Sequence, residues 1–166
     1  MNGISHYKSW SGLNKQLSDC LCDSLRGRIT YFLTRYHEVH NAYGRASIRL
    51  DGKETVCFSW ADETRQEADR VQLWREARQW EPTPEMKEKW DRDATLSDTD
   101  FLRAATDFLS MPISDALASP SALIRVFAIL DRRVGARTLQ RIREAEEYKT
   151  YPDWVQTFYR LRLGIL

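Results

Sequence analysis

The stretch Arg45-Ala-Ser-Ile-Arg-Leu-Asp-Gly-Lys-Glu-Thr-Val-Cys-Phe-Ser-Trp60 decides the fold. Asp51-Gly52 at its centre is a strong signal for a two-residue hairpin turn, because such turns need the positive φ that these residue types tolerate. On both sides of the turn, small or apolar residues alternate with polar ones, which is typical of strands with one buried face. The stretch therefore predicts two antiparallel strands joined by a tight turn.

A third strand precedes this hairpin. Arg28-Ile-Thr-Tyr-Phe-Leu-Thr-Arg-Tyr36 is rich in β-branched and aromatic residues, which favour strands. Residues 41–44 form turn-type sequence between this run and the hairpin. We expect a three-stranded antiparallel meander over residues 28–60, with one face that other elements must cover.

Helical patterns lie on both sides of the predicted meander. Ahead of it, Ser9 or Ser11 can cap a helix whose apolar stripe runs to Leu25 and which Gly27 ends. After it, Thr83-Pro84 and Ser119-Pro120 combine a capping residue with proline at the first helical position. Helices are expected over about 62–79, 84–90, 97–109, 120–130, 137–148 and 153–163, with a single turn at 114–117.

These patterns define an α+β protein. It has an N-terminal helix, a three-stranded antiparallel meander and a C-terminal array of five to six helices. A chain of 166 residues fits one domain, 1–166, in which residues 1–60 hold the helix and meander and residues 61–166 the helical part. Six Trp, seven Tyr and six Phe supply a substantial core, so disulfides are not needed for stability.

Composition narrows the compartment and the class of function. The net charge is only +1, so no field of the whole chain favours nucleic acid or an anionic membrane. The charge is uneven, since residues 61–100 hold 12 acidic and 7 basic side chains. Three cysteines, the absence of an apolar run at the start and the absence of a membrane-spanning run predict a cytoplasmic protein.

Motifs for catalysis, cofactors and metals are absent from the sequence. No nucleophile elbow, phosphate-binding loop or dinucleotide fingerprint occurs. Cys20-x-Cys22 and His37-x-x-His40 hold zinc-type ligands, but residues two apart on a helix point in nearly opposite directions. We therefore expect no cofactor and no metal, and we interpret the cysteines as core residues. An enzyme is left only if its site is assembled in space.

An arginine-rich segment is one candidate surface. Arg133, Arg137 and Arg141 are four residues apart and form a cationic stripe if a helix continues through Gly135, with Arg132 beside it. Such a stripe could contact nucleic-acid phosphates. Alternatively, these arginines pair with carboxylates of this chain, such as the acidic middle, or of a partner protein.

Tryptophans mark a second candidate surface. Trp60, Trp74, Trp80 and Trp90 lie in or beside the acidic middle. Helical periodicity assigns Trp60 and Trp74 to the core, whereas Trp80 and Trp90 are expected at the surface. Exposed tryptophan among charges is typical of protein–protein interfaces. The predicted partner-binding residues are therefore Trp80, Trp90, Arg132, Arg133, Arg137 and Arg141.

Three stretches carry a resemblance to a known family, namely Trp10-Ser-Gly-Leu-Asn-Lys-Gln-Leu17, the Leu25-Arg-Gly-Arg28 turn and Leu130-Asp-Arg-Arg-Val-Gly135. In these stretches the chain resembles a family of small bacterial cytosolic proteins without an established activity. Ala136 departs from the family pattern, which has a basic residue there. The resemblance implies a bacterial protein and brings no catalytic residue.

Taken together, the residues predict a non-enzymatic, protein-binding module of a bacterial cytosolic protein, of immunity type or accessory type. The alternative is a nucleic-acid-binding module that uses the arginine-rich segment, and an enzyme is the third reading. The identity of the partner and the oligomeric state stay open at this level.

Overall fold

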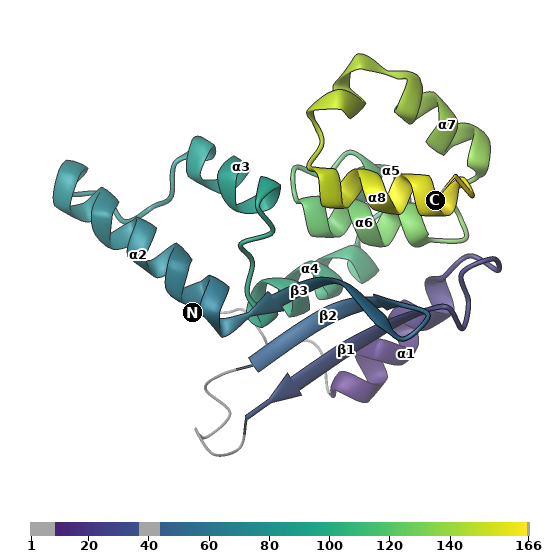
Figure 1. Ribbon diagram of the computed structural model, residues 1–166, viewed down its shortest axis with the longest axis horizontal. Helices are drawn as coiled ribbons and strands as arrows, with labels where there is room; N and C mark the ends of the chain where they lie inside the picture. The colour runs from purple at the N-terminus through teal and green to yellow at the C-terminus, as the bar shows by residue number, and fades with distance from the viewer. Residues whose placement is uncertain (1–8, 37–43, 166) are drawn as a thin grey trace.

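The computed structural model describes residues 9–36 and 44–165. Helix α1 (Trp10–Cys20) precedes a sheet of three strands, β1 (Ile29–Arg35), β2 (Gly44–Leu50) and β3 (Lys53–Ser59). The strand order is β1-β2-β3 and both pairings are antiparallel (Figure 1). The predicted meander is confirmed, apart from the turn predicted at residues 41–44, which falls largely outside the described residues.

The hairpin turn between β2 and β3 has the predicted geometry. Asp51 and Gly52 have φ values of 50° and 80°, as a two-residue turn of this hand requires. The pairing shifts register between Ile48 and Arg49, where a bulge is inserted. This turn brings β3 back so that its end leads directly into the first helix beyond the sheet.

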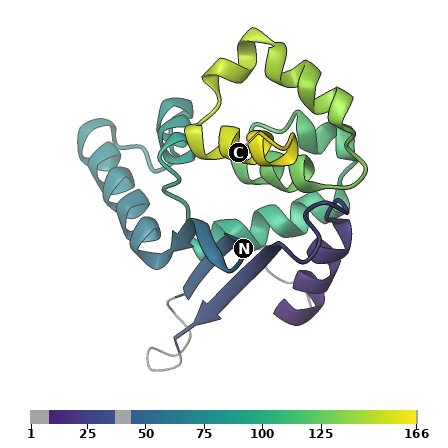
Figure 2. The same cartoon turned by 45° about the vertical axis from the view of Figure 1, so that its right-hand side comes forward.

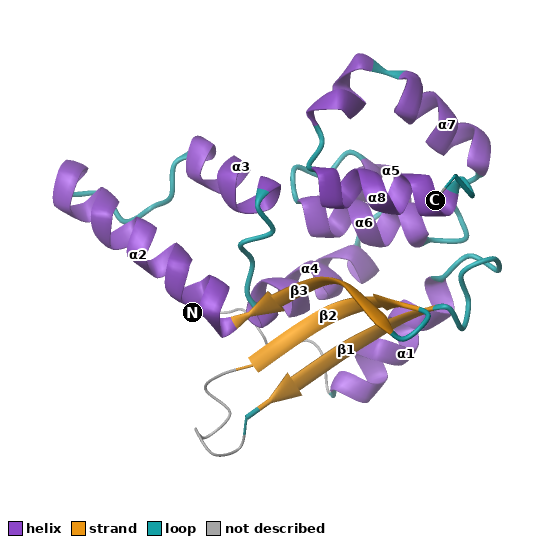
Figure 3. Ribbon diagram, viewed as in Figure 1, coloured by secondary structure: helices purple, strands orange, loops and turns teal. Residues whose placement is uncertain are grey.

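All regular structure after the sheet is helical, as Figure 3 shows. In residues 60–165 seven α-helices and one 3-10 helix follow one another. They are α2 (Trp60–Ala77), α3 (Pro84–Arg92), α4 (Asp98–Ser110), α5 (Ile113–Leu117), α6 (Ala122–Leu130), α7 (Ala136–Glu144), the 3-10 helix η2 (Glu146–Thr150) and α8 (Asp153–Arg162). The predicted α+β class is confirmed, and whether residues 1–166 are one domain stays a prediction.

The core lies between the sheet and the stacked helices. Helices α1 and α4 cover one face of the sheet, and α6 packs on α4 and against α5 and α8 (Figure 2). Phe127 on α6 stands at the centre, with ring centroids of Tyr31, Phe101 and Phe108 within 5.6–5.7 Å. Residues of the sheet, α4 and α6 therefore share one aromatic cluster.

Helix α1 is shorter than its apolar stripe predicts. The helix was expected to continue to Gly27, but it ends at Cys20, where the chain turns toward the end of α6. The backbone N–H of Cys22 donates to the oxygen of Leu130 at 2.9 Å, and that of Arg132 donates to the oxygen of Cys20 at 2.8 Å. These tertiary hydrogen bonds replace helical ones, while Leu25 still enters the core.

Two other boundaries differ from the predicted ones. Helix α6 is capped by Ser121, whose hydroxyl accepts from the N–H of Ile124, and not by Ser119. The hydroxyl of Ser119 instead accepts from the N–H of Ser121 at 3.1 Å, so it orders the turn before the helix. The expected helix 137–148 is split into α7 and η2 by the extended backbone of Ala145.

Candidate functional site

Helix α2 is held to the rest of the molecule through a polar inner face. The amide nitrogen of Gln66 donates to the backbone oxygen of Thr95 at 2.7 Å and to Asp100 Oδ2 at 3.0 Å. One turn further along, Asp69 Oδ2 accepts from the indole nitrogen of Trp90 at 2.7 Å. The guanidinium of Arg70, the next residue, lies 5.1 Å from the Trp90 ring centroid. No residue from 59 to 89 belongs to the main hydrophobic cluster, so these contacts hold α2 in place of apolar packing.

Among the described residues, no other element lines the outer face of α2 beyond Trp60. In that part of the chain, a shallow hollow along the helix is lined by α2 residues three and four apart, from Trp60 through Glu67 and Val71 to Arg75. In Figure 1 the second half of α2 projects away from the sheet and from the α4–α6 stack. We call α2 together with Arg78–Trp80 the tryptophan arm.

A stacked pair of tryptophans stands at the end of the arm. The rings of Trp74 and Trp80 lie 5.3 Å apart with planes 14° from parallel. Arg78, at the end of α2, adopts a left-handed conformation with φ of 57°, which turns the chain back so that Trp80 reaches Trp74. The guanidinium of Arg78 lies 5.6 Å from the Trp74 ring centroid, within cation–π range.

The tryptophans are distributed differently from the prediction. Trp80 is 49% exposed, as expected, but Trp90 is only 5% exposed, so its predicted exposure is wrong. Trp60 and Trp74 were assigned to the core, yet they are 40% and 36% exposed. The physical reason is that the buried stripe of α2 is polar and follows Asp62 and Gln66, a helix face that hydrophobic periodicity does not detect.

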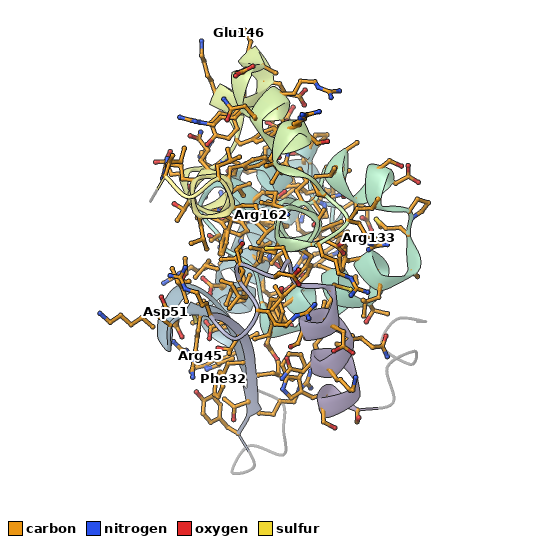
Figure 4. The ribbon with its side chains drawn as sticks, turned by 90° about the vertical axis from the view of Figure 1, so that its right-hand side faces the viewer. Phe32, Arg45, Asp51, Arg133, Glu146 and Arg162 are labelled. Carbon is orange, nitrogen blue, oxygen red and sulfur yellow. The ribbon has the colours of Figure 1, made fainter. Side chains whose placement is uncertain are left out.

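The arginine stripe does not form as one surface. Helix α6 ends at Leu130 and α7 begins after Gly135, so Arg133 is not in line with the arginines of α7. Arg133 instead forms a bidentate pair with Asp131, at 3.0 Å from Nε and 2.7 Å from Nη2. Arg162 Nη2 also donates to the oxygen of Val134 at 2.6 Å, which ties α8 to this loop (Figure 4).

Substitution of Arg133 is expected to lower stability, whereas substitution of Arg132 is not. Asp131 is 1% exposed, so Arg133→Ala leaves a buried carboxylate without its counter-charge and costs about 2 kcal/mol, less than a fully buried pair because Arg133 is half exposed. Arg132→Ala, at an exposed neighbour without an ion pair in the described residues, is the matched control and should cost under about 0.5 kcal/mol. Urea denaturation measures both, and equal losses would contradict this role of Arg133.

The arginines of α7 lie at the surface. Arg137 and Arg141 are exposed one turn apart, and neither pairs with a carboxylate in the part of the chain that the structure describes. The expected alternative, pairing with the acidic middle, does not occur there, since α2 and α3 lie at the opposite side of the molecule from α7 (Figure 1). Gln140 and Glu144 interrupt the basic face of α7 and bond to each other at 2.7 Å.

Metal ligands do not gather in the described residues, where no group of three His, Cys, Asp or Glu side chains could hold an ion. Cys22 is buried and Cys20 half-buried, and both are free thiols. His37 and His40, the other zinc-type residues of the sequence, lie outside the described residues. Of the described helices, none has the length and apolar composition needed to span a membrane.

One group of residues was missed by the sequence reasoning. Asp91 on α3, Arg125 on α6 and Tyr151 after η2 line one cavity. They are far apart in the chain, and each occurs alone, without a motif around it. The only signal in the sequence was that Arg125 interrupts the most apolar helix of the protein.

The fold and these surfaces define an α+β protein whose helical part presents an aromatic arm and a separate basic helix. The chain belongs to the SF0329 protein family, whose model matches residues 9–163. The match covers the acidic middle as well as both ends of the chain. No curated protein and no solved structure matches this chain.

Proposed function

We propose that this protein is a non-enzymatic, protein-binding module that contacts its partner through the tryptophan arm. The observation that carries the proposal is the Trp74–Trp80 stack, which is exposed although the chain has a well-formed aromatic core. Large exposed aromatic side chains on a rigid element are typical of interface anchors. The stack holds both rings in place before binding, which lowers the entropic cost of association.

The charge of the arm indicates the chemistry of the partner. Residues 61–100 hold 12 acidic and 7 basic side chains, and Glu63 and Glu67 are exposed on the outer face of α2. Partial desolvation and the nearby carboxylates of Asp98 and Asp100 raise the pKa of Glu63, which reflects the negative potential at the base of the arm. A partner with an apolar cleft rimmed by basic side chains complements this surface. In an immunity-type or accessory role in a bacterial cytosol, the arm would cover this cleft of the partner. Such binding needs an interface of roughly 800 Å² on each side.

Loss of either tryptophan of the stacked pair is expected to abolish most partner binding without unfolding the protein. Partners captured from the source organism are compared between the unchanged chain, Trp74→Ala, Trp80→Ala and Tyr36→Ala. Tyr36 is the matched control because it is 40% exposed and follows β1, outside the stacked tryptophan pair. With the purified partner, each arm variant should raise Kd about 10- to 100-fold, as truncation of an interface anchor does.

Two results would overturn the proposal. One is that no specific partner is captured under native conditions. The other is that a captured partner binds the two arm variants as tightly as it binds Tyr36→Ala. Thermal unfolding of each variant must stay close to that of the unchanged chain, because the two arm side chains are surface-exposed.

Nucleic-acid binding through α7 is the second candidate. It is supported by Arg137 and Arg141, which are exposed on one face without carboxylate partners in the described residues. The face is short, and Glu144 reduces its charge. Titration with DNA and RNA at two salt concentrations separates the candidates, because phosphate contacts weaken steeply with salt.

A further inference from the structure

A cavity of about 390 Å³ lies between α3, the first turn of α6 and the segment that joins η2 to α8. Its volume is within the range of small-molecule sites. Asp91, Arg125, Glu147 and Tyr151 line it, and they come from different elements. The cavity is separate from the tryptophan arm, so partner binding by the arm does not account for these residues.

Polar groups at and behind this cavity have unused hydrogen-bonding capacity. Nε of Arg125 and the hydroxyl of Tyr159 are buried and have no hydrogen-bond partner among the described residues. Tyr159 does not line the cavity, but its ring centroid lies 6.0 Å from that of Tyr151, which does. Among the described residues, the carboxylate of Asp91 accepts one hydrogen bond, from the N–H of Ala122 at 3.3 Å. Since buried polar groups are normally satisfied, such a concentration is typical of a site that binds a polar ligand.

Arg125 is placed to receive a carboxylate. Its guanidinium carbon lies 4.4 Å from the centroid of the Tyr151 ring, so one face of the group is covered. Its edges carry the N–H donors, and its Nε has no hydrogen-bond partner among the described residues. A carboxylate that accepts two parallel bonds suits a guanidinium better than any neutral group does.

The cavity also holds negative charge, which the acidic side chains around Arg125 supply. Three acidic residues line the cavity, Asp91, Glu147 and Glu88. They outnumber its two basic residues, Arg125 and Arg92. This arrangement disfavours a multiply charged anion such as a phosphate ester. Burial raises the pKa of Asp91 to about 6, so the group is ionised at neutral pH although it is poorly hydrated. A poorly hydrated carboxylate gains from a cationic partner.

We infer that this cavity binds a small zwitterion of the α-amino-acid class, with its carboxylate on Arg125 and its ammonium group toward Asp91 and Glu147. Both charges of the ligand are needed, because either one alone leaves a charged group of the cavity without a partner. The ligand side chain points out of the charged part of the cavity toward Pro120 and Pro152, which line it as well.

Binding to the whole protein tests this inference directly. The twenty common L-amino acids are added one at a time at millimolar concentration, and thermal unfolding and calorimetry are recorded. At least one amino acid should raise the unfolding temperature and bind with a measurable Kd. Its N-acetyl derivative and its methyl ester, each with one charge removed, should bind at least tenfold more weakly.

Two variants assign the binding to this cavity. Arg125→Met should weaken binding at least tenfold, whereas Arg143→Met on the surface of α7 is the matched control and should bind like the unchanged chain. Asp91→Asn removes the carboxylate that faces the ammonium group and keeps the size of the side chain, so the protein should stay folded while its affinity falls at least tenfold. The Asp91→Asn result stands even if Arg125→Met does not fold.

Several outcomes would overturn the inference. No stabilisation or heat of binding with any of the amino acids is the first. Equal binding of the singly charged derivatives is the second. Unchanged affinity of both folded cavity variants is the third, since it would place the ligand elsewhere on the protein.

Discussion

Phe127→Ala is expected to lower the free energy of unfolding by about 3–5 kcal/mol, because it leaves a large cavity in a rigid core. Phe127 is 2% exposed and contacts the rings of Tyr31, Phe101 and Phe108. These rings belong to the sheet, α4 and α6, so the cavity cannot collapse by movement of a single element. For a chain of this length the midpoint of thermal unfolding should fall by on the order of 10 °C.

Phe32→Ala provides the matched control for this core substitution. Phe32 is a half-buried phenylalanine on the open face of the sheet, where the guanidinium of Arg49 lies 3.9 Å from its ring centroid (Figure 4). The space left by its truncation opens onto solvent, so the free energy of unfolding should fall by about 1 kcal/mol. Urea denaturation of both variants measures the difference. Similar losses for the two would show that Phe127 is not at the centre of the core.

Asp91→Asn is expected to stabilise the protein at neutral pH by up to about 3 kcal/mol. Burial raises the pKa of Asp91 to about 6, from near 3.9 in an unfolded chain, although Arg125 and the N–H of Ala122 act in the opposite direction. The folded protein therefore holds this proton more tightly than the unfolded chain does. The resulting stability is present in full below about pH 4 and is lost as the pH rises through about 6.

The asparagine variant separates this charge effect from packing. Its side-chain oxygen can still accept from the N–H of Ala122, but it carries no charge to be desolvated. Urea denaturation should show a gain at pH 7.5 that is about three times the gain at pH 4.5. At pH 4.5 the folded Asp91 is protonated, whereas the unfolded one is still largely ionised. Asp93→Asn, at an exposed carboxylate two residues along, should change stability little at either pH. A loss of stability for Asp91→Asn at pH 7.5 would contradict the account.

The expected effect of Asp91→Asn bears on the role of the cavity. A more stable asparagine variant would mean that stability alone does not explain an aspartate at position 91. Groups held at such a cost are typical of sites that bind or react with a ligand. The expected stability of Asp91→Asn and the expected ligand of the cavity therefore arise from the same local electrostatics.

Local sequence predicted the sheet because the determinants of a meander are local. Strand alternation and the Asp51-Gly52 turn act between residues adjacent in the chain, and both appear as expected. The same holds for the start of α4, where Ser97 caps the helix by accepting from the N–H of Asp100 at 3.1 Å. Helix ends that depend on distant residues were predicted less well, as at Cys20, where the end of α6 takes over the hydrogen bonds.

In the candidate sites, too, features that depend on residues distant in the chain were predicted less well than local ones. Trp80 was correctly expected at the surface, but Trp90 was not recognised as buried, because its partner Asp69 lies 21 residues earlier. Arg133 was expected in a binding surface, whereas its bidentate bonds to Asp131 give it a structural role. The partner-binding roles of all six residues remain predictions, namely those of Trp80, Trp90, Arg132, Arg133, Arg137 and Arg141.

The sequence by itself determined the α+β class, the order of the elements and the presence of an aromatic core, since periodicity, turn residues and caps act over a few residues. Only the tertiary structure decided which side chains are exposed on α2 and which charged groups meet around Asp91. The physical reason is that burial and charge pairing depend on contacts between elements, here α2 with α3 through Asp69 and Trp90, and α3 with α6 through Asp91 and Ala122. Such contacts leave no local periodic signal.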